Sequence, residues 1–387
     1  MAKRIYMDNH ATTPVDPRVL RAMLPYFSDK FGNAASNTHL FGREAKAAVE
    51  KARNKIAQLI GAEPREIIFT SGATESNNLA IKGAAAAHGR KGRHLITVQT
   101  EHKSVLDCFK RLSMDGFQVT YLGVRKDGLL DLAELKKAVT AETILISVMM
   151  ANNETGVIGP IADIGKIAKE KGVLFHCDAA QAVGKIPVSV GKLGVDLLSF
   201  NAHKIYGPKG IGALFVRKSE PRVQIIPLLD GGGHEVGLRS GTLNVPGIVG
   251  MGEACRICNI ELARESQRLE KLRNKLRDGL MKALPNSVVI GSQTQRLPNN
   301  LTISFPGVSA GNLMKGLNSV ALSSGSACLS SSLEPSYVLR ALGLNENTMR
   351  SSIRFGLGRF NTEAEVDLVI GKVTKAVRRL LAPPVVK

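Results

Sequence analysis

Lys204 lies between an apolar run and a turn-forming stretch, in the segment SFNAHKIYGPKGIGALFV (residues 199–216). The preceding VDLLSF is typical of a short buried strand, and the glycines and proline that follow end regular structure. Because open α/β sheets bind ligands at the carboxyl ends of their strands, a lysine here is a candidate for chemistry. A desolvated lysine amine can lose its proton and condense with an aldehyde. For Lys204 alone, an ordinary surface lysine is the simpler interpretation.

Polar clusters follow four other apolar runs in the same half of the chain. These are SGATESNN after IIFT, EHKS after LITVQT, NNETG after ILISVMMA and DAAQ after LFHC. The runs are β-branched, lack strict alternation and are separated by amphipathic segments, a pattern typical of a mainly parallel sheet with helices on both faces. The strand ends of a parallel sheet share one edge, so we expect the clusters to line one crevice.

Two of these clusters match further chemical needs. The amides of Gly72, Ala73 and Thr74 come just before an expected helix and could hold a phosphate, although a simple helix cap explains them equally well. Asp178 ends an expected buried strand and needs a cation, unless it caps the helix that carries Gln181. A phosphate cradle, a buried carboxylate and a strand-end lysine together fit the phosphate, ring nitrogen and aldehyde of pyridoxal 5'-phosphate.

The chain closely resembles the cysteine desulfurases of the class V aminotransferase group, in the branch with the long catalytic loop, the NifS/IscS-like enzymes. The shared motifs run in order along nearly the whole chain: MDNHATTPVDPRV, GNAASNTHLFGREA, FTSGATESNNLAIKG, TEHKSVLD, NNETGVIGPI, DAAQAVGK, SFNAHKIYGPKGIGAL, GGGHEVGLRSGTLNVPGIVGMG, SSGSACLSSSLEPSYVLRALGL and SIRFGLGRF. This resemblance implies the fold type I of pyridoxal-phosphate enzymes, a mainly parallel α/β domain with helices on both faces plus a smaller α+β domain.

The resemblance assigns roles residue by residue. Lys204 becomes the Schiff-base lysine, Asp178 the partner of the pyridine nitrogen, and His102 the residue stacked on the ring and available for proton transfer. Arg354 would grip the substrate carboxylate. The remaining contacts implied to the cofactor come from Ala73, Thr74, Asn153, Gln181, Asn201, His203 and, from a second subunit, Thr242; Asn153 also lies near the substrate. Asn201 stands where this branch commonly has serine, so its phosphate contact would come from an amide.

Cys328, in SSGSACLSSS, falls on the family's catalytic cysteine. Its small polar neighbours independently predict a mobile, exposed loop, about 322–333. The implied reaction removes sulfur from L-cysteine, leaves alanine and forms a persulfide on Cys328, with His102 as our hypothetical proton acceptor for the thiol. The sulfur would pass to an acceptor protein for iron-sulfur cluster assembly or tRNA thiolation. The resemblance implies no permanently bound metal. Cys328 is the one residue that we consider as a transient ligand of an iron-sulfur cluster.

The domain organisation follows from a change in the pattern of predicted strands and helices near residue 258. We expect a large cofactor-binding domain over 14–258, then a charged helix over about 259–285 leading into a small domain of 1–13 and 259–387 that carries the catalytic loop. The last residues, RRLLAPPVVK, differ from the longer tail that helps bacterial members dock their iron-sulfur scaffold, so that partner is a weaker expectation than the chemistry.

Composition limits the alternatives. With 387 residues, 44% apolar content, no run of 18 apolar residues and no leader pattern, we expect a globular cytoplasmic protein with no membrane association. The Thr242 contact from a second subunit, which the resemblance implies, predicts a homodimer. Five cysteines are few and odd in number, and the CRIC pair has no partners for a zinc site. A selenocysteine lyase or an aminotransferase of the same group stays open. The net charge of +19 also leaves open a non-catalytic RNA-binding protein, although low aromatic content (4%) disfavours it and the chemistry requires no nucleic acid.

Overall fold

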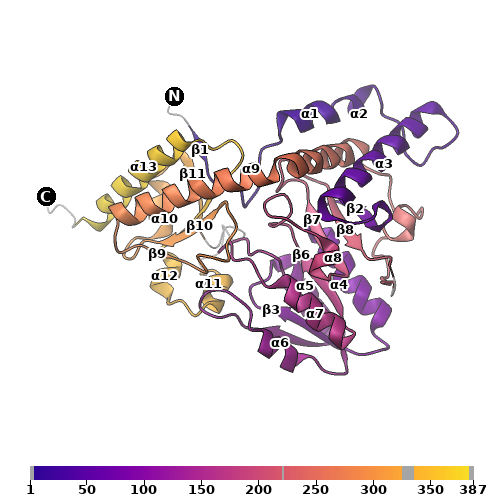
Figure 1. The fold of residues 1–387 in the computed structure, drawn as a ribbon, viewed down its shortest axis with the longest axis horizontal. Helices are drawn as coiled ribbons and strands as arrows, with labels where there is room; N and C mark the ends of the chain where they lie inside the picture. The colour runs from indigo at the N-terminus through magenta and orange to yellow at the C-terminus, as the bar shows by residue number, and fades with distance from the viewer. Residues whose placement is uncertain (1–3, 220–221, 325–334, 383–387) are drawn as a thin grey trace.

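The computed structural model describes residues 4–219, 222–324 and 335–382. Its largest element is a seven-stranded sheet in the order β2-β8-β7-β6-β5-β3-β4 (Figure 1). The strands are β2 (Ile67–Thr70), β3 (His94–Val98), β4 (Gln118–Leu122), β5 (Thr143–Ser147), β6 (Leu174–Asp178), β7 (Leu197–Asn201) and β8 (Gly212–Val216). Only β8 runs against the others, so the predicted mainly parallel sheet is confirmed.

Alternate residues of each strand enter two different cores, as the pleat of a strand requires. In β7, Leu198 packs into the core formed with α3, α7 and α9, whereas Leu197 packs into the core formed with α4 and α5. These helices are α3 (Leu40–Ile60), α4 (Ala73–His88), α5 (Lys103–Met114), α7 (Ile161–Lys171) and α9 (Val245–Ala283). Both faces of the sheet are therefore buried, which explains why its strands lack alternating polarity.

Shorter elements surround the sheet. They are α1 (Pro17–Met23), α2 (Pro25–Ser28), η1 (Pro64–Glu66), α6 (Leu132–Ala138), α8 (Val190–Leu193) and η2 (Glu235–Gly237). In the sheet, β2, β3, β5, β6 and β7 all point their carboxyl ends to one edge, where the polar clusters of the sequence follow them.

A second core lies around a four-stranded antiparallel sheet, β12-β13-β10-β9. Its strands are β9 (Val288–Val289), β10 (Asn300–Ser304), β12 (Ser323–Ser324) and β13 (Ser352–Gly356). The helices of this part are α10 (Ala310–Lys315), α11 (Tyr337–Ala341), α12 (Glu346–Arg350) and α13 (Glu363–Leu381). The amino-terminal strand β1 (Ile5–Tyr6) joins this part by pairing with β11 (Val320–Ala321).

The connecting helix is longer than the sequence predicted. Instead of beginning near residue 259, α9 begins at Val245, after Asn244 caps its first turn by accepting from the Gly247 N–H. Figure 1 shows this one helix crossing from the large sheet to the small domain. The predicted bounds cover only the charged amphipathic part, because the glycine-rich first half is nonpolar on most sides and buried.

The buried side of α9 changes cores along its length. Residues up to Cys258 pack into a core of the large sheet, and those from Leu269 onward pack into the core of the small sheet. On this basis we propose that 14–258 forms one domain and that 1–13 and 259–387 form the other. No helix in the described parts of the chain is long and apolar enough to span a membrane.

Candidate active site

The predicted site residues gather around one cavity of about 280 Å³ at the carboxyl edge of the large sheet. Its lining includes Ala73, Thr74, His102, Asn153, Asp178, Gln181, Asn201, His203, Lys204 and Arg354. Thr242 lies exposed outside this lining, and Cys328 and most of the predicted 322–333 loop lie outside the described residues. His10 also lines the cavity, although no role was predicted for it from the sequence.

Lys204 lies in the turn between β7 and β8, and its ammonium donates to the backbone oxygens of His10 and Ala11, the latter at 2.7 Å. The amino-terminal segment holds this turn. The Thr13 hydroxyl donates to the His203 carbonyl at 2.9 Å and accepts from the Tyr206 N–H at 2.9 Å. The lysine therefore projects from a backbone fixed on both sides.

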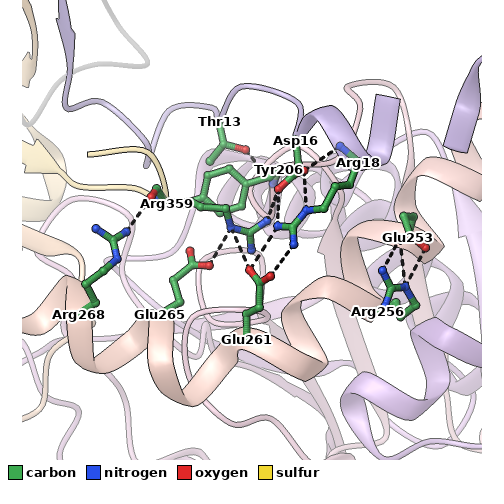
Figure 2. A network of polar contacts seen from close by, with 10 residues as sticks. All are labelled: Thr13, Asp16, Arg18, Tyr206, Glu253, Arg256, Glu261, Glu265, Arg268 and Arg359. Carbon is green, nitrogen blue, oxygen red and sulfur yellow. Dashed lines mark hydrogen bonds and ion pairs between the residues drawn. The ribbon is translucent and has the colours of Figure 1, made fainter. Parts of the chain in front are cut away.

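Tyr206 anchors the same turn in a network of charged residues (Figure 2). The Arg359 guanidinium lies over the Tyr206 ring, 4.2 Å from its centroid, and the Arg359 backbone N–H donates to the phenol oxygen at 2.6 Å. Arg359 also pairs with Asp16 and Glu265, each at 2.8 Å. Because Arg359 belongs to the small domain, this network fastens that domain to the Lys204 turn.

Asp178 supplies a buried negative charge at the end of β6, where its side chain lines the cavity. One of its oxygens accepts from the Asn77 amide at 2.8 Å, and the other accepts from the Ala180 N–H at 2.9 Å. Among the described residues, no ion pair includes Asp178, so its charge is held only by neutral donors. A buried carboxylate in this state favours a cationic ligand group.

His102 caps α5, and its neighbours determine its tautomer. Nδ1 accepts from the Ser104 backbone N–H at 3.2 Å, so it carries no proton, and the Ser104 hydroxyl also donates to it at 2.8 Å. Burial lowers the pKa of His102, and nearby Lys204 lowers it further, while Asp178 opposes the shift. The neutral ring therefore presents an N–H at Nε2. With Nε2 already protonated, the His102 ring can accept a further proton only at Nδ1, and only after the hydrogen bonds from Ser104 to Nδ1 break.

The start of α4 is suited to an anion. Its N-cap is Gly72, which has no side chain to satisfy the first N–H groups, and the cavity reaches Ala73 and Thr74. The chain passes close by: a Cβ on Gly212 would lie 2.6 Å from the Gly72 Cα, so glycine is required there. His203 lies on the same side, with its pKa lowered to about 4 by burial and by Lys204.

Arg354 reaches the cavity from β13 of the small domain. Its guanidinium donates to Asp8 at 2.9 Å and to the Asn153 carbonyl at 2.8 Å, while its buried Nε–H has no partner among the described residues. The side chain is only 3% exposed. One donor of this cavity-lining arginine is therefore left unused by the described chain.

The described residues that flank the Cys328 segment, one group before it and one after it, both lie near Arg354. Before it, Ser323 of β12 pairs in register with Arg354. After it, the Ser336 hydroxyl donates to the carboxylate of Glu154, and the Tyr337 hydroxyl donates to the Glu101 carbonyl at 2.7 Å. Both attachments belong to the clusters that line the sheet edge.

The four described cysteines, Cys108, Cys177, Cys255 and Cys258, are all buried and free. Burial raises the pKa of each thiol, to about 11 for Cys108. None of them can readily form the thiolate that a sulfur nucleophile needs. The described residues also contain no cluster of three histidine, cysteine or acidic side chains able to hold a metal.

Four residues with a place in the site were missed from the sequence: His10, Asn77, Ser104 and Glu154. They contact Gln181, Asp178, His102 and the Ser336 hydroxyl respectively. All four lie inside the motifs MDNHATTPVDPRV, FTSGATESNNLAIKG, TEHKSVLD and NNETGVIGPI, which were the available signal.

Comparison with known proteins agrees with this arrangement. The family model described as aminotransferase class-V matches residues 5–369. A relative from Anaeromyxobacter sp. (strain K), named cysteine desulfurase IscS, is 58% identical over 97% of this chain and 93% of its own length. The Homo sapiens protein named cysteine desulfurase is 54% identical over 97% of this chain and 82% of its own.

Solved structures give the same result. A NifS-like protein superposes with a TM-score of 0.91 at 43% identity, covering 97% of this chain and all of the other. A structure described as SspA in complex with cysteine superposes with a TM-score of 0.80 at 37% identity, covering 92% of this chain and all of the other. The chain therefore belongs to the class-V aminotransferase family, among the cysteine desulfurases of the IscS and NifS type.

Proposed function

We propose that this protein is a pyridoxal-phosphate-dependent cysteine desulfurase that converts L-cysteine to L-alanine and keeps the sulfur as a persulfide on Cys328. The observation that carries the proposal is the cavity, which combines the Lys204 amine, the uncompensated Asp178 carboxylate and the Arg354 guanidinium. The identities of 54% and 58% to proteins named cysteine desulfurase support it.

The residues present fit pyridoxal phosphate. Asp178, buried without a cation among the described residues, suits the protonated ring nitrogen, and the uncapped start of α4 suits the phosphate, with Asn201 and His203 beside it. Lys204 would hold the aldehyde carbon, and Gln181 and Asn153 would reach the phenolic oxygen. When bound, this cofactor supplies the electron sink that allows an α-proton to leave the amino acid.

The side chains around the cavity bind and orient the substrate. Arg354 would take the L-cysteine carboxylate through its unpaired Nε–H, while Asp8 and the Asn153 carbonyl fix the guanidinium plane. His102 would stack on the cofactor ring, held by Ser104. The Lys204 amine, freed when the substrate binds, would move the α-proton.

Cys328 would attack the sulfur of the bound L-cysteine as a thiolate. A sulfur–sulfur bond forms, the carbon–sulfur bond breaks with its electron pair remaining on the carbon side, and protonation there yields alanine. Three residues separate Cys328 from Ser324, which pairs with Ile353 next to Arg354, so an extended chain would span at most about 14 Å between them.

We further propose that the persulfide sulfur passes to an acceptor protein, such as an iron-sulfur scaffold or a tRNA-thiolation protein, in the cytoplasm. A second copy of the chain would complete the phosphate site with Thr242, which lies exposed outside its own cavity. Cross-mixing a Thr242→Ala chain with a Lys204→Ala chain tests this arrangement. Heterodimers in which one site is intact should recover activity that neither homodimer has.

The test of the function is turnover of L-cysteine with alanine and sulfide measured separately, alongside the visible absorption of the bound cofactor. Lys204→Ala should lose the absorption band, and Cys328→Ser should keep the band and lose turnover. A Cys328→Ser protein that still forms alanine at the wild-type rate would refute the persulfide route. Release of selenide from L-selenocysteine by this variant, without cysteine turnover, would favour a selenocysteine lyase.

A further inference from the structure

His10 is a buried histidine in the cavity wall whose two ring nitrogens have different surroundings. The residue is 1% exposed and lines the cavity together with Gln181, Lys204 and Arg354. Its Nδ1 lies 2.9 Å from Oε1 of Gln181. Its Nε2 is buried and has no hydrogen-bond partner among the described residues.

The contacts of Gln181 determine where the His10 proton lies. The Gln181 amide nitrogen donates to the backbone carbonyl of His10 at 3.0 Å, and a carbonyl can only accept. The amide oxygen therefore faces the ring, and since this oxygen also only accepts, Nδ1 must carry the proton. Nε2 is then an unprotonated acceptor.

The environment keeps the ring neutral. Burial lowers the pKa of His10 to about 3, and the positive charges of Arg354, Lys204 and Lys185 add to the shift against the opposing Gln181 hydrogen bond. The Cδ2 edge of the ring packs closely against Gly356, where an added Cβ would lie only 2.8 Å from Cδ2.

Within the described residues, two buried atoms of this wall therefore lack partners: the Nε2 lone pair of His10 and the Nε–H of Arg354. Because an unpaired buried polar atom is costly, both favour a ligand that completes them. L-cysteine carries the complementary groups, namely a carboxylate that accepts and ammonium and thiol groups that donate.

We propose that His10 is a substrate-binding residue that also positions Gln181. Its Nδ1–H and its carbonyl fix the Gln181 carboxamide, and its Nε2 accepts a hydrogen bond from the bound amino acid. The inference rests on the proposed desulfurase function and on the cofactor contact of Gln181. A wild-type protein that binds no cofactor would refute that function, whereas the variants below test His10 alone.

Two substitutions separate the two nitrogens. His10→Asn keeps a donor near the Nδ1 position and removes the Nε2 acceptor, and His10→Gln keeps an acceptor near Nε2 and removes the Nδ1 donor. We expect the KM for L-cysteine to rise about fivefold in His10→Asn, as the loss of one hydrogen bond predicts, and to change less than about twofold in His10→Gln. The visible absorption band and its pH titration should shift in His10→Gln and stay unchanged in His10→Asn.

The matched control is His94→Asn. His94 is also buried, bonds Thr143 and Thr120, and begins β3 at the opposite edge of the sheet. Its KM and absorption band should match the wild type. Equal changes of KM in both His10 variants, or a change in neither, would overturn the substrate contact, and an unshifted band in His10→Gln would overturn the positioning of Gln181.

A measurement on the wild-type holoenzyme covers the case in which the variants fail to fold. With ¹⁵N-labelled histidine, the chain gives signals from eight histidines. We expect one ring with a protonated Nδ1 and a bare Nε2 that shifts when L-alanine is added, while buried His176, bonded to Ser147 and Ser199, stays fixed. If no ring other than the fixed His176 shows this tautomer, or if its bare Nε2 does not respond to L-alanine, the proposal is wrong.

Discussion

Ser336 donates its hydroxyl proton to the carboxylate of Glu154, with 2.5 Å between the two oxygens, and so ties the start of α11 to the NNETG cluster. Glu154 is 6% exposed, and its backbone carbonyl also accepts from Asn300 and Thr302. The chain that follows the Cys328 segment is therefore attached to the edge of the active site in part through a buried acid, beside the contact of Tyr337 with the Glu101 carbonyl.

The burial of Glu154 predicts that the free energy of unfolding depends on pH. Burial raises the pKa of Glu154 from 4.5 to about 7, so the folded chain binds this proton more tightly than the unfolded chain. The resulting stabilisation, up to about 3 kcal/mol, is complete below about pH 4 and is lost as the pH rises through 7. Glu154→Gln keeps an acceptor for Ser336 and removes the titration. Its unfolding free energy should therefore vary less than that of the wild type between about pH 4 and pH 8 in urea titrations.

Glu346→Gln is the control, because this exposed residue pairs with Arg350 on the surface of α12. Its pH profile should follow the wild type. Profiles of Glu154→Gln and wild type that run parallel across the whole range would show that Glu154 is not the titrating group.

Asp178→Asn should abolish activity while leaving the fold intact. The amide keeps the size of the side chain but removes the negative charge that would hold a protonated ring nitrogen. Breaking a buried ion pair costs about 3–5 kcal/mol, so we expect kcat/KM to fall at least about 100-fold and the absorption of the bound cofactor to change. Asp163→Asn, an exposed partner of Lys166, should leave both unchanged. Activity of Asp178→Asn within about threefold of the wild type would contradict the assigned role.

Ser104→Ala should loosen His102. The substitution removes the hydroxyl that donates to His102 Nδ1 and accepts from Asn77, and it leaves the backbone N–H in place. The hydrogen bond that positions His102 contributes about 1 kcal/mol, so its loss predicts a fall in kcat of about fivefold, with a smaller change in KM. Ser113→Ala, exposed on the same helix, is the control. Equal effects of the two substitutions on kcat would refute the positioning role.

The sheet and many residues of the cavity wall could be predicted from the sequence, because both depend on the order of residues within short segments of the chain. Asp178 and Asn201 each follow directly on an apolar run, Lys204 comes three residues after Asn201, and parallel strands bring such ends to one edge. His10 and Gln181 are 171 residues apart, and neither residue type alone indicates the contact. Glu154 and Ser336 meet only once the small domain is docked, so their pairing depends on tertiary structure that no local pattern encodes.

Arg359→Ala should destabilise the protein strongly, through the network in Figure 2. The substitution leaves Asp16 and Glu265 without their buried cation and removes the stacking on Tyr206. We expect a loss of about 3–5 kcal/mol in urea unfolding. Arg256→Ala breaks a more exposed pair with Glu253 and should cost less than about 1 kcal/mol. Similar losses for both arginines would mean that the network does not hold the domains together.

Whether Cys328 takes sulfur from L-cysteine can be read from mass spectrometry of the intact Cys328 peptide. The purified wild-type protein is treated with L-cysteine and then alkylated. We predict one extra sulfur atom on Cys328 in the wild type and none on Cys108, Cys177, Cys255 or Cys258, whose buried thiols have raised pKa values. Lys204→Ala should give no modified peptide. Alanine formation with an unmodified Cys328, or sulfur on one of the buried cysteines, would refute the persulfide on Cys328.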